Sequence, residues 1–143
     1  MFKPIRVLIA DNDVDFATSL KAFLDEQADT QVIDMVRDGQ GTVNACKETL
    51  PDVVLIDLHL PVLDSIKTIQ ALINQNEYIK ILSISSIAND RYAVEAIKAG
   101  ASGYIEKNGH TNYLEIAEAI RQVAGGEVIL NPTLASYILQ EFS

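Results

Sequence analysis

Five short runs rich in β-branched and aliphatic residues recur along the chain, and segments with helical periodicity separate them. The runs cover residues 5–10, 32–36, 53–57, 79–84 and a shorter stretch at 104–105. Such runs predict strands, and apolar residues at spacings of three and four predict helices that pack by one face. The order is therefore strand then helix, repeated five times.

The predicted helices each carry one apolar stripe. The stripes are Phe16, Leu20, Phe23 and Leu24; Val43, Cys46 and Leu50; Ile66, Ile69 and Ile73; Ala93, Ala96 and Ile97; and Ile116, Ile120 and Val123. Asp64, Asp90 and the capping box at 112–115 predict helix starts, while Gly100 and Gly125 stand where a left-handed C-cap is favoured.

This order predicts an α/β fold. Strands that are apolar on both faces and joined by helices lie parallel in a sheet that is covered on both sides. Right-handed crossover connections then place helices on both faces, which gives a doubly wound sheet. The flavodoxin-like strand order 2-1-3-4-5 is a common solution, with a switch point between the first and third strands. Ligands in such sheets bind at the carboxyl ends of the strands, so functional residues are expected there.

The segment after residue 125 predicts a sixth, peripheral helix. Asn131 and Pro132 suit the N-cap and first helical positions, and Leu134, Tyr137 and Ile138 form a small apolar stripe. We therefore divide the chain into residues 1–125, which form the (βα)5 unit, and residues 126–143, which form a C-terminal linker and helix.

Composition limits the function classes. A chain of 143 residues that is 48% hydrophobic fits one domain with a sizeable core. Eleven basic against twenty acidic residues give a net charge of −9, which disfavours direct binding to nucleic acid. The single cysteine, Cys46, excludes an internal disulfide and is predicted to be inert core. No apolar run approaches the roughly 20 residues of a membrane span, so a cytoplasmic protein without membrane contact is expected.

Polar side chains follow four of the predicted strands. They are the 11–13 segment Asp-Asn-Asp, Asp57, Ser85 with its neighbouring serine, and Lys107. Carboxylates brought together at one edge of a sheet repel each other, so a proton or a cation must join them. Oxygen ligands without a His/Cys cluster suit Mg²⁺ rather than zinc, and both histidines, His59 and His110, are predicted to be solvated loop residues.

A carboxylate beside a divalent cation and a lysine can act as a nucleophile toward phosphorus. Phosphorylation of Asp is a known covalent strategy, and the cation neutralises charge on the phosphoryl group. Asp57 ends a strongly apolar strand, where a carboxylate is costly without a functional partner. The Ser85 hydroxyl could then hydrogen-bond the new phosphoryl oxygen.

Four motifs in this order resemble the receiver domain of two-component response regulators. They are VLIADND, PDVVLIDLHLPVLD, IKILSIS and AIKAGASGYIEKN, and the resemblance covers residues 4 to about 125. AGASGYIEK and the tail AIRQVAGGEVILNPTLASYIL are most similar to the subfamily in which a receiver precedes a LuxR/NarL-type helix-turn-helix. That DNA-binding part is absent, so we expect either a receiver cut from a longer regulator or a stand-alone one.

The resemblance implies a role for each matching position. These roles are Asp57 as phosphoacceptor; Asp11, Asn12, Asp57 and the His59 backbone carbonyl around Mg²⁺; Ser85 as switch hydroxyl; Lys107 as partner of the phosphoryl group; and Tyr104 as the aromatic that turns inward. It also implies a signalling module rather than an enzyme, phosphorylated by a sensor histidine kinase, homodimeric, and contacting DNA only through the absent domain. Phosphorylation would change the surface of the fourth helix, fifth strand and fifth helix.

Two positions depart from the family pattern. Asn12 stands where a second acidic residue usually contacts the metal, which removes one negative charge, and Ser65 replaces the usual glycine after the loop aspartate, which makes that loop less permissive. Because of Asn12, a second interpretation remains: an atypical receiver that works as an interaction module without phosphorylation.

Two other classes remain as weaker alternatives. A phosphatase of the haloacid-dehalogenase type also uses an Asp nucleophile, but it carries a second Asp where this chain has His59 and a different order of motifs. A flavodoxin-like flavin carrier lacks support because the first loop has no phosphate cradle and the chain has no tryptophan.

Overall fold

A computed structural model describes residues 3–86, 90–107 and 112–141. The described chain forms five strands and six helices: β1 (Ile5–Ala10), α1 (Val14–Glu26), β2 (Thr30–Val36), α2 (Gly39–Thr49), β3 (Val53–Asp57), α3 (Ser65–Gln75), β4 (Lys80–Ser85), α4 (Asp90–Ala99), β5 (Gly103–Glu106), α5 (Tyr113–Ala124) and α6 (Pro132–Glu141). The strands form one parallel sheet in the order β2-β1-β3-β4-β5, which confirms the predicted fold class and strand order.

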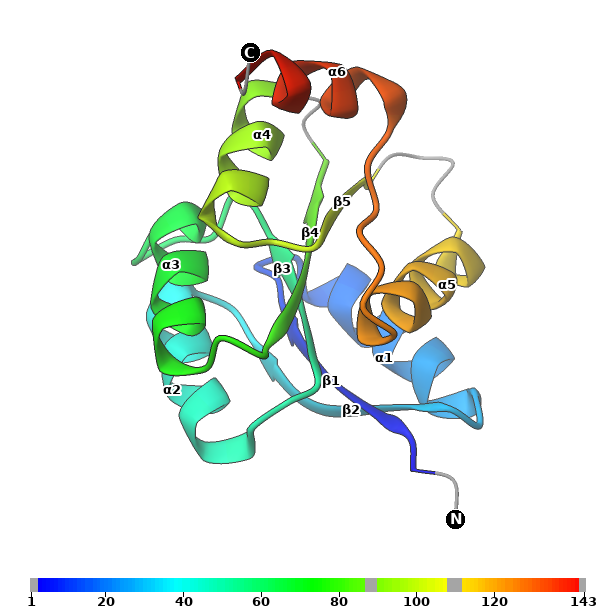
Figure 1. Cartoon of the computed structure of the whole chain (residues 1–143). Coiled ribbons are helices and arrows are strands. Elements are labelled where there is room, and N and C mark those ends of the chain that lie inside the picture. The colour runs from blue at the N-terminus through cyan, green and yellow to red at the C-terminus, as the bar shows by residue number, and fades with distance from the viewer. Residues whose placement is uncertain (1–2, 87–89, 108–111, 142–143) are drawn as a thin grey trace.

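Helices cover both faces of the sheet (Figure 1). On one face, α2, α3, α4 and α6 pack on side chains such as Leu8, Val54 and Ile81. On the other face, α1 and α5 pack on the alternate side chains, such as Ile9 and Leu55. Because the central strands are buried on both faces, their sequences read as continuous apolar runs rather than as alternating patterns.

The strand register brings the polar residues to one edge of the sheet. Ala10 of β1 lies opposite Ile56 of β3, so Asp57 and the residue after Ala10 leave the sheet at the same level. On the other side, Ser85 of β4 lies opposite Glu106 of β5, and the next residue after Glu106 is Lys107. Parallel strands therefore deliver all four chain segments to the carboxyl edge, as the topology requires.

Most predicted helix boundaries hold, with two corrections. Leu50, predicted in the apolar stripe of the second helix, is instead the exposed C-cap of α2, with a φ of 50°. Asp64 and Asn112 cap α3 and α5 with their side chains, and Gly100 has the positive φ of 126° expected after α4. The prediction of a left-handed C-cap at Gly125 was wrong, because the φ of Gly125 is −81° and its N–H still donates to carbonyls of the helix. The chain turns one residue later, at Gly126, where φ is 93°.

The segment after α5 adds a contact that the sequence did not predict. Ile129 forms an isolated parallel bridge with Gly103 of β5. Its N–H donates to the Ser102 carbonyl at 2.9 Å, and its carbonyl accepts the Tyr104 N–H at 3.1 Å. A Cβ at Gly103 would lie 3.0 Å from the Ile129 Cβ, so the lack of a side chain allows the two backbones to approach. The tail thus lies along the outer edge of β5.

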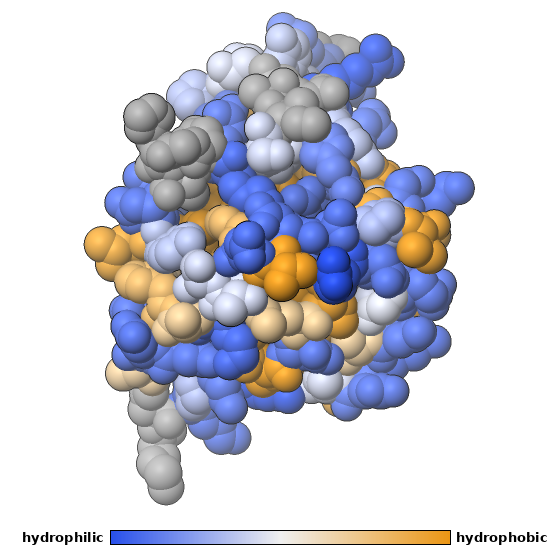
Figure 2. Space-filling view, turned by 180° about the vertical axis from the view of Figure 1, so that it is seen from behind, coloured by the Kyte–Doolittle hydropathy of each residue, from blue (hydrophilic) through white to orange (hydrophobic). Residues whose placement is uncertain are grey.

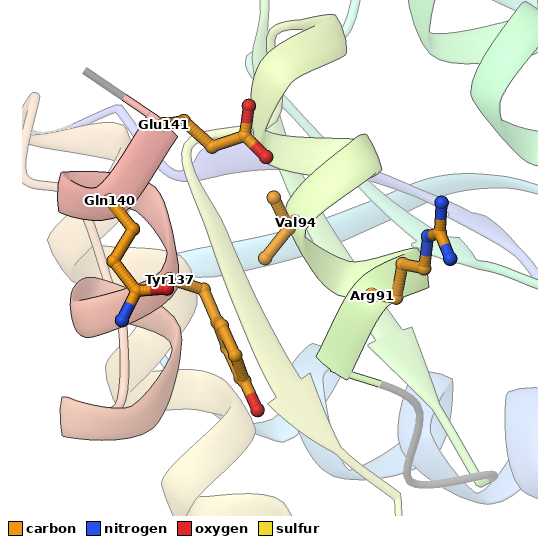
Figure 3. A pocket seen from close by; sticks show the side chains of 5 residues that line it. All are labelled: Arg91, Val94, Tyr137, Gln140 and Glu141. Atoms are coloured by element: carbon orange, nitrogen blue, oxygen red, sulfur yellow. The ribbon is translucent and has the colours of Figure 1, made fainter. Parts of the chain in front are cut away.

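Beyond this bridge, α6 packs on α4. Leu134 is fully buried in the core cluster of that face, and Lys98 of α4 forms a 3.4 Å ion pair with Glu141. A pocket of about 560 Å³ lies between the two helices. Figure 3 shows the side chains that line it, which are Arg91, Val94, Tyr137, Gln140 and Glu141. None of these lining residues belongs to the strand ends where functional residues are predicted.

The face of the molecule opposite to the view of Figure 1 carries hydrophobic groups in several places. Figure 2 shows small hydrophobic groups separated by hydrophilic residues on this face. None of the helices within the described ranges has the length and apolar character that a membrane crossing needs. Cys46 is buried, and burial raises the pKa of its thiol to about 12, as expected for an inert core cysteine.

The loop after β3 contains a strained residue that yields a prediction. Val62 has a φ of 74°, so the backbone of a β-branched residue lies in the left-handed region. Its side chain is 82% exposed, so little packing offsets the cost of this conformation. We expect Val62→Gly to raise the free energy of unfolding by about 0.5–1 kcal/mol, because a non-glycine residue in this region costs roughly 1–2 kcal/mol and glycine costs part of that in chain entropy.

Urea denaturation measures this change. Val128→Gly is the matched control, since Val128 is also exposed but lacks a positive φ. That variant should lose stability through the added freedom of the unfolded chain. Equal effects of the two substitutions would contradict the strain at Val62.

Candidate functional site

A lysine and two carboxylates meet at the carboxyl edge of the sheet. Lys107, just after β5, donates from Nζ to Asp11 Oδ2 at 2.9 Å and to Asp57 Oδ2 at 3.2 Å. Asp11 is 3% exposed and Asp57 is 7% exposed, so both acids are largely removed from water. Buried carboxylates of this kind require charged partners, and here one ammonium group serves both.

The electrostatics follow from burial and pairing. Burial raises the pKa of Asp11 above its usual range, against the lowering effect of the Lys107 ammonium and the Asp13 N–H. For Lys107, burial alone would lower the pKa, but the hydrogen bonds and charges of Asp11 and Asp57 outweigh it and raise the pKa. The ammonium also lies 4.3 Å from the centroid of the Phe16 ring, a cation–π contact from α1.

The backbone of the loop after β3 fixes the orientation of Asp57. Its Oδ1 accepts the His59 N–H at 2.7 Å, so both carboxylate oxygens have a donor in this structure. The Ser65 hydroxyl donates to the Asp57 carbonyl at 2.6 Å and accepts the Leu60 N–H at 3.2 Å. Ser65 is fully buried, and it ties the first turn of α3 to the strand end at the position where the resemblance implies a glycine.

A second contact holds the far side of this loop. The Gly39 N–H, at the start of α2, donates to the Pro61 carbonyl at 3.1 Å. A Cβ at Gly39 would collide with the backbone oxygen of Leu63, so glycine is required for the loop to approach the helix. The Asp57 loop is thus held by α2 as well as by α3.

Ser85 lies at the end of β4 with a histidine as one of its partners. Its hydroxyl is 3.0 Å from His59 Nε2, and Ser85 is only 2% exposed. The His59 ring packs edge-on against Tyr92 of α4, with centroids 5.5 Å apart and an interplanar angle of 87°. His59 was predicted as a solvated loop histidine; it is exposed, but its ring makes these two contacts. His110 lies outside the described residues.

The remaining predicted residues differ in burial. Tyr104 of β5 is buried in the core cluster on the α2, α3 and α4 face. Asn12 is exposed next to Asp11, between the end of β1 and the start of α1. The structure therefore joins Asp11, Asp57 and Lys107 directly, and places Ser85 against the Asp57 loop.

The oxygen donors of this edge fit a hard cation. Within the described part of the chain, no three His, Cys, Asp or Glu side chains form a metal cluster. The predicted ligands, which are two carboxylates, the Asn12 amide and the His59 backbone carbonyl, are all oxygen donors. Mg²⁺ accepts such a set, since it takes one or two carboxylates and keeps several waters.

The Ser65 contacts give a prediction for the loop. We expect Ser65→Ala to lower the free energy of unfolding by about 1–3 kcal/mol, because the buried Leu60 N–H and Asp57 carbonyl lose the hydroxyl that bonds both. Urea denaturation measures the loss, and Ser19→Ala at an exposed position of α1 is the control, with a change within about 0.5 kcal/mol. Similar values for both variants would contradict a stabilising role of the Ser65 hydroxyl.

Solved structures share this fold. The receiver domain of the putative response regulator NarL from Mycobacterium tuberculosis is 25% identical with a TM-score of 0.81, covering 87% of this chain and 99% of that one. The response regulator domain of Thermotoga maritima CheB is 28% identical with a TM-score of 0.77, covering 91% of this chain and all of that one. A LuxR-family response regulator from Aurantimonas is 24% identical with a TM-score of 0.85, covering 98% and 99%.

Sequence comparison gives the family. The transcriptional regulatory protein LiaR of Bacillus subtilis is 34% identical over 135 residues, which cover 94% of this chain and 63% of LiaR. This chain thus spans less than two thirds of that relative. The family described as the response regulator receiver domain matches residues 7–121. The chain therefore belongs to the receiver domain family of two-component response regulators.

Proposed function

We propose that Asp57 accepts a phosphoryl group from a sensor histidine kinase and that residues 1–125 form the receiver. The observation that carries this proposal is the Lys107 ammonium held between the buried carboxylates of Asp11 and Asp57. A carboxylate oxygen of Asp57 forms the new P–O bond while the bond from phosphorus to the donor imidazole breaks. The electron pair of that bond stays on the imidazole nitrogen, which takes a proton from water.

Four groups would hold a magnesium ion at this edge: the Asp11 and Asp57 carboxylates, the Asn12 amide and the His59 backbone carbonyl. When bound, Mg²⁺ neutralises negative charge on the transferring phosphoryl group. Lys107 offers a second positive charge to the phosphoryl group, because its ammonium already lies 3.2 Å from Asp57 Oδ2. The His59 N–H fixes the other carboxylate oxygen, so the nucleophile is oriented before a donor arrives.

After transfer, the phosphoryl oxygens become strong acceptors for Lys107 and the Ser85 hydroxyl. Movement of Ser85 toward the phosphoryl group would change the packing around Tyr104, which is already buried, and with it the surface of α4, β5 and α5. A charged hydrogen bond contributes about 1.5–3 kcal/mol, which is enough to shift a poised two-state equilibrium about tenfold or more.

The relatives support a role in transcription control. LiaR is named a transcriptional regulatory protein, and the Aurantimonas structure is named a LuxR-family response regulator. We infer that residues 126–143 lead to a LuxR-type DNA-binding domain and that the receiver acts as a homodimer. Membership of the receiver family removes the support for a haloacid-dehalogenase phosphatase or a flavin carrier.

One observation favours a second candidate within the same family. Asn12 supplies no charge beside Asp11, so a weakly metal-binding receiver could act as an interaction module without phosphorylation. The two candidates differ in one measurable property, the covalent modification of Asp57.

Incubation with a small acyl phosphate and Mg²⁺, followed by intact mass spectrometry, tests the proposal. We expect the mass of one phosphoryl group to be added to the natural protein and not to Asp57→Asn, because the amide is not a nucleophile toward phosphorus. Removal of Mg²⁺ by a chelator should abolish the addition. An unmodified natural protein would instead support the interaction module.

The substitution Asn12→Asp tests the weakened metal site. We expect it to tighten Mg²⁺ binding about tenfold and to speed phosphorylation, because it restores a carboxylate beside Asp11. Calorimetric titration with Mg²⁺ measures the affinity. Asn44→Asp adds the same charge at an exposed position of α2 and should leave the affinity unchanged. Equal affinity in Asn12→Asp and the natural protein would contradict a role for this position in metal binding.

A further inference from the structure

We propose that the His59 imidazole is a latch that holds the Ser85 hydroxyl and the start of α4 in the unphosphorylated arrangement. The proposal rests on the proposed function, since a phosphoryl group on Asp57 is the group that would take the hydroxyl away. His59 acts through Ser85 and is therefore a positioning residue.

The geometry of the latch is set by the backbone on both sides. The Leu58 N–H donates to the Ile84 carbonyl at 2.9 Å, which joins the Asp57 loop to the end of β4. The next residue on each segment, His59 and Ser85, then brings Nε2 and Oγ to 3.0 Å. Which of the two atoms donates depends on the tautomer of the imidazole. Since Ser85 is 2% exposed, bulk water has little access to replace the histidine.

The same ring reaches a third segment. Its edge-on contact with Tyr92 places the imidazole against the start of α4. One side chain thus contacts the end of β4 and α4 while its own N–H holds the Asp57 carboxylate. When Ser85 turns toward a phosphoryl oxygen, the hydrogen bond between His59 and Ser85 breaks. The His59 ring is then free to move, so its packing against Tyr92 changes.

The relative strengths of the bonds make such a latch reversible. A neutral hydrogen bond between imidazole and hydroxyl is weaker than a bond from the hydroxyl to a charged phosphoryl oxygen. Phosphorylation therefore releases the latch. Before phosphorylation the latch competes for the Ser85 hydroxyl. The apparent affinity for a phosphoryl mimic is therefore lower than the intrinsic affinity, in proportion to the fraction of molecules in which the latch is open.

Binding of beryllofluoride in the presence of Mg²⁺ tests the latch on the full chain. We expect His59→Ala to bind about three- to tenfold more tightly than the natural protein, because the imidazole no longer competes for the Ser85 hydroxyl. His59→Gln keeps an amide that can reach the hydroxyl and should bind like the natural protein. In a Ser85→Ala background, His59→Ala should have no further effect.

Unchanged or weaker binding by His59→Ala would overturn the proposal, and so would an equal gain in the Ser85→Ala background. If the natural protein binds no beryllofluoride, the proposed function is contradicted instead. The latch is then tested by amide spectra of the ligand-free proteins. Amide spectra of the free His59→Ala protein should show shifts both at Ser85 and in α4 (Asp90–Ala99). His59→Gln keeps a hydrogen-bonding group for Ser85 but removes the ring that packs on Tyr92, so its shifts should occur in α4 and not at Ser85. The absence of shifts in His59→Ala would overturn the latch.

Discussion

The ammonium group of Lys107 is the charge on which the site depends. It lies within 3.2 Å of oxygens from Asp11 and Asp57, two acids that the sheet removes almost completely from water. Without it, two carboxylates at neighbouring strand ends would repel each other in a poorly solvated place. The short strand β5 therefore places the lysine beside the two carboxylates as well as packing in the sheet, because it ends one residue before this lysine.

Rigidity around Asp57 comes from neighbours that carry no charge. Ser65 and Gly39 hold the loop from α3 and α2, while the His59 N–H orients the carboxylate. Such fixed surroundings keep a nucleophile in one geometry, which lowers the entropic cost of reaction. The imidazole of the same histidine contacts Ser85 and Tyr92, the two residues that would move in the proposed switch.

Much of this arrangement was predictable from the chain alone. The fold followed from the alternation of strands and helices, and the meeting of Asp11, Asp57 and Lys107 followed from their places after parallel strands. The contact between His59 and Ser85 was not predictable, because the direction of a loop side chain depends on packing between distant segments. The Ile129 bridge was missed for a similar reason: one residue beside a strand gives no periodic signal.

That bridge has a consequence for self-association. Outer strands of a sheet present unpaired backbone groups on which another chain can add a strand, and proteins protect these edges by covering them. Ile129 occupies the outer side of β5 at Gly103, whereas β2 at the other end pairs with β1 and with no further strand of the described chain. An incoming strand is thus obstructed at β5 by the chain itself, and at β2 it would compete with the Asp25 and Asp34 carboxylates, which already accept the Val32 and Met35 N–H groups.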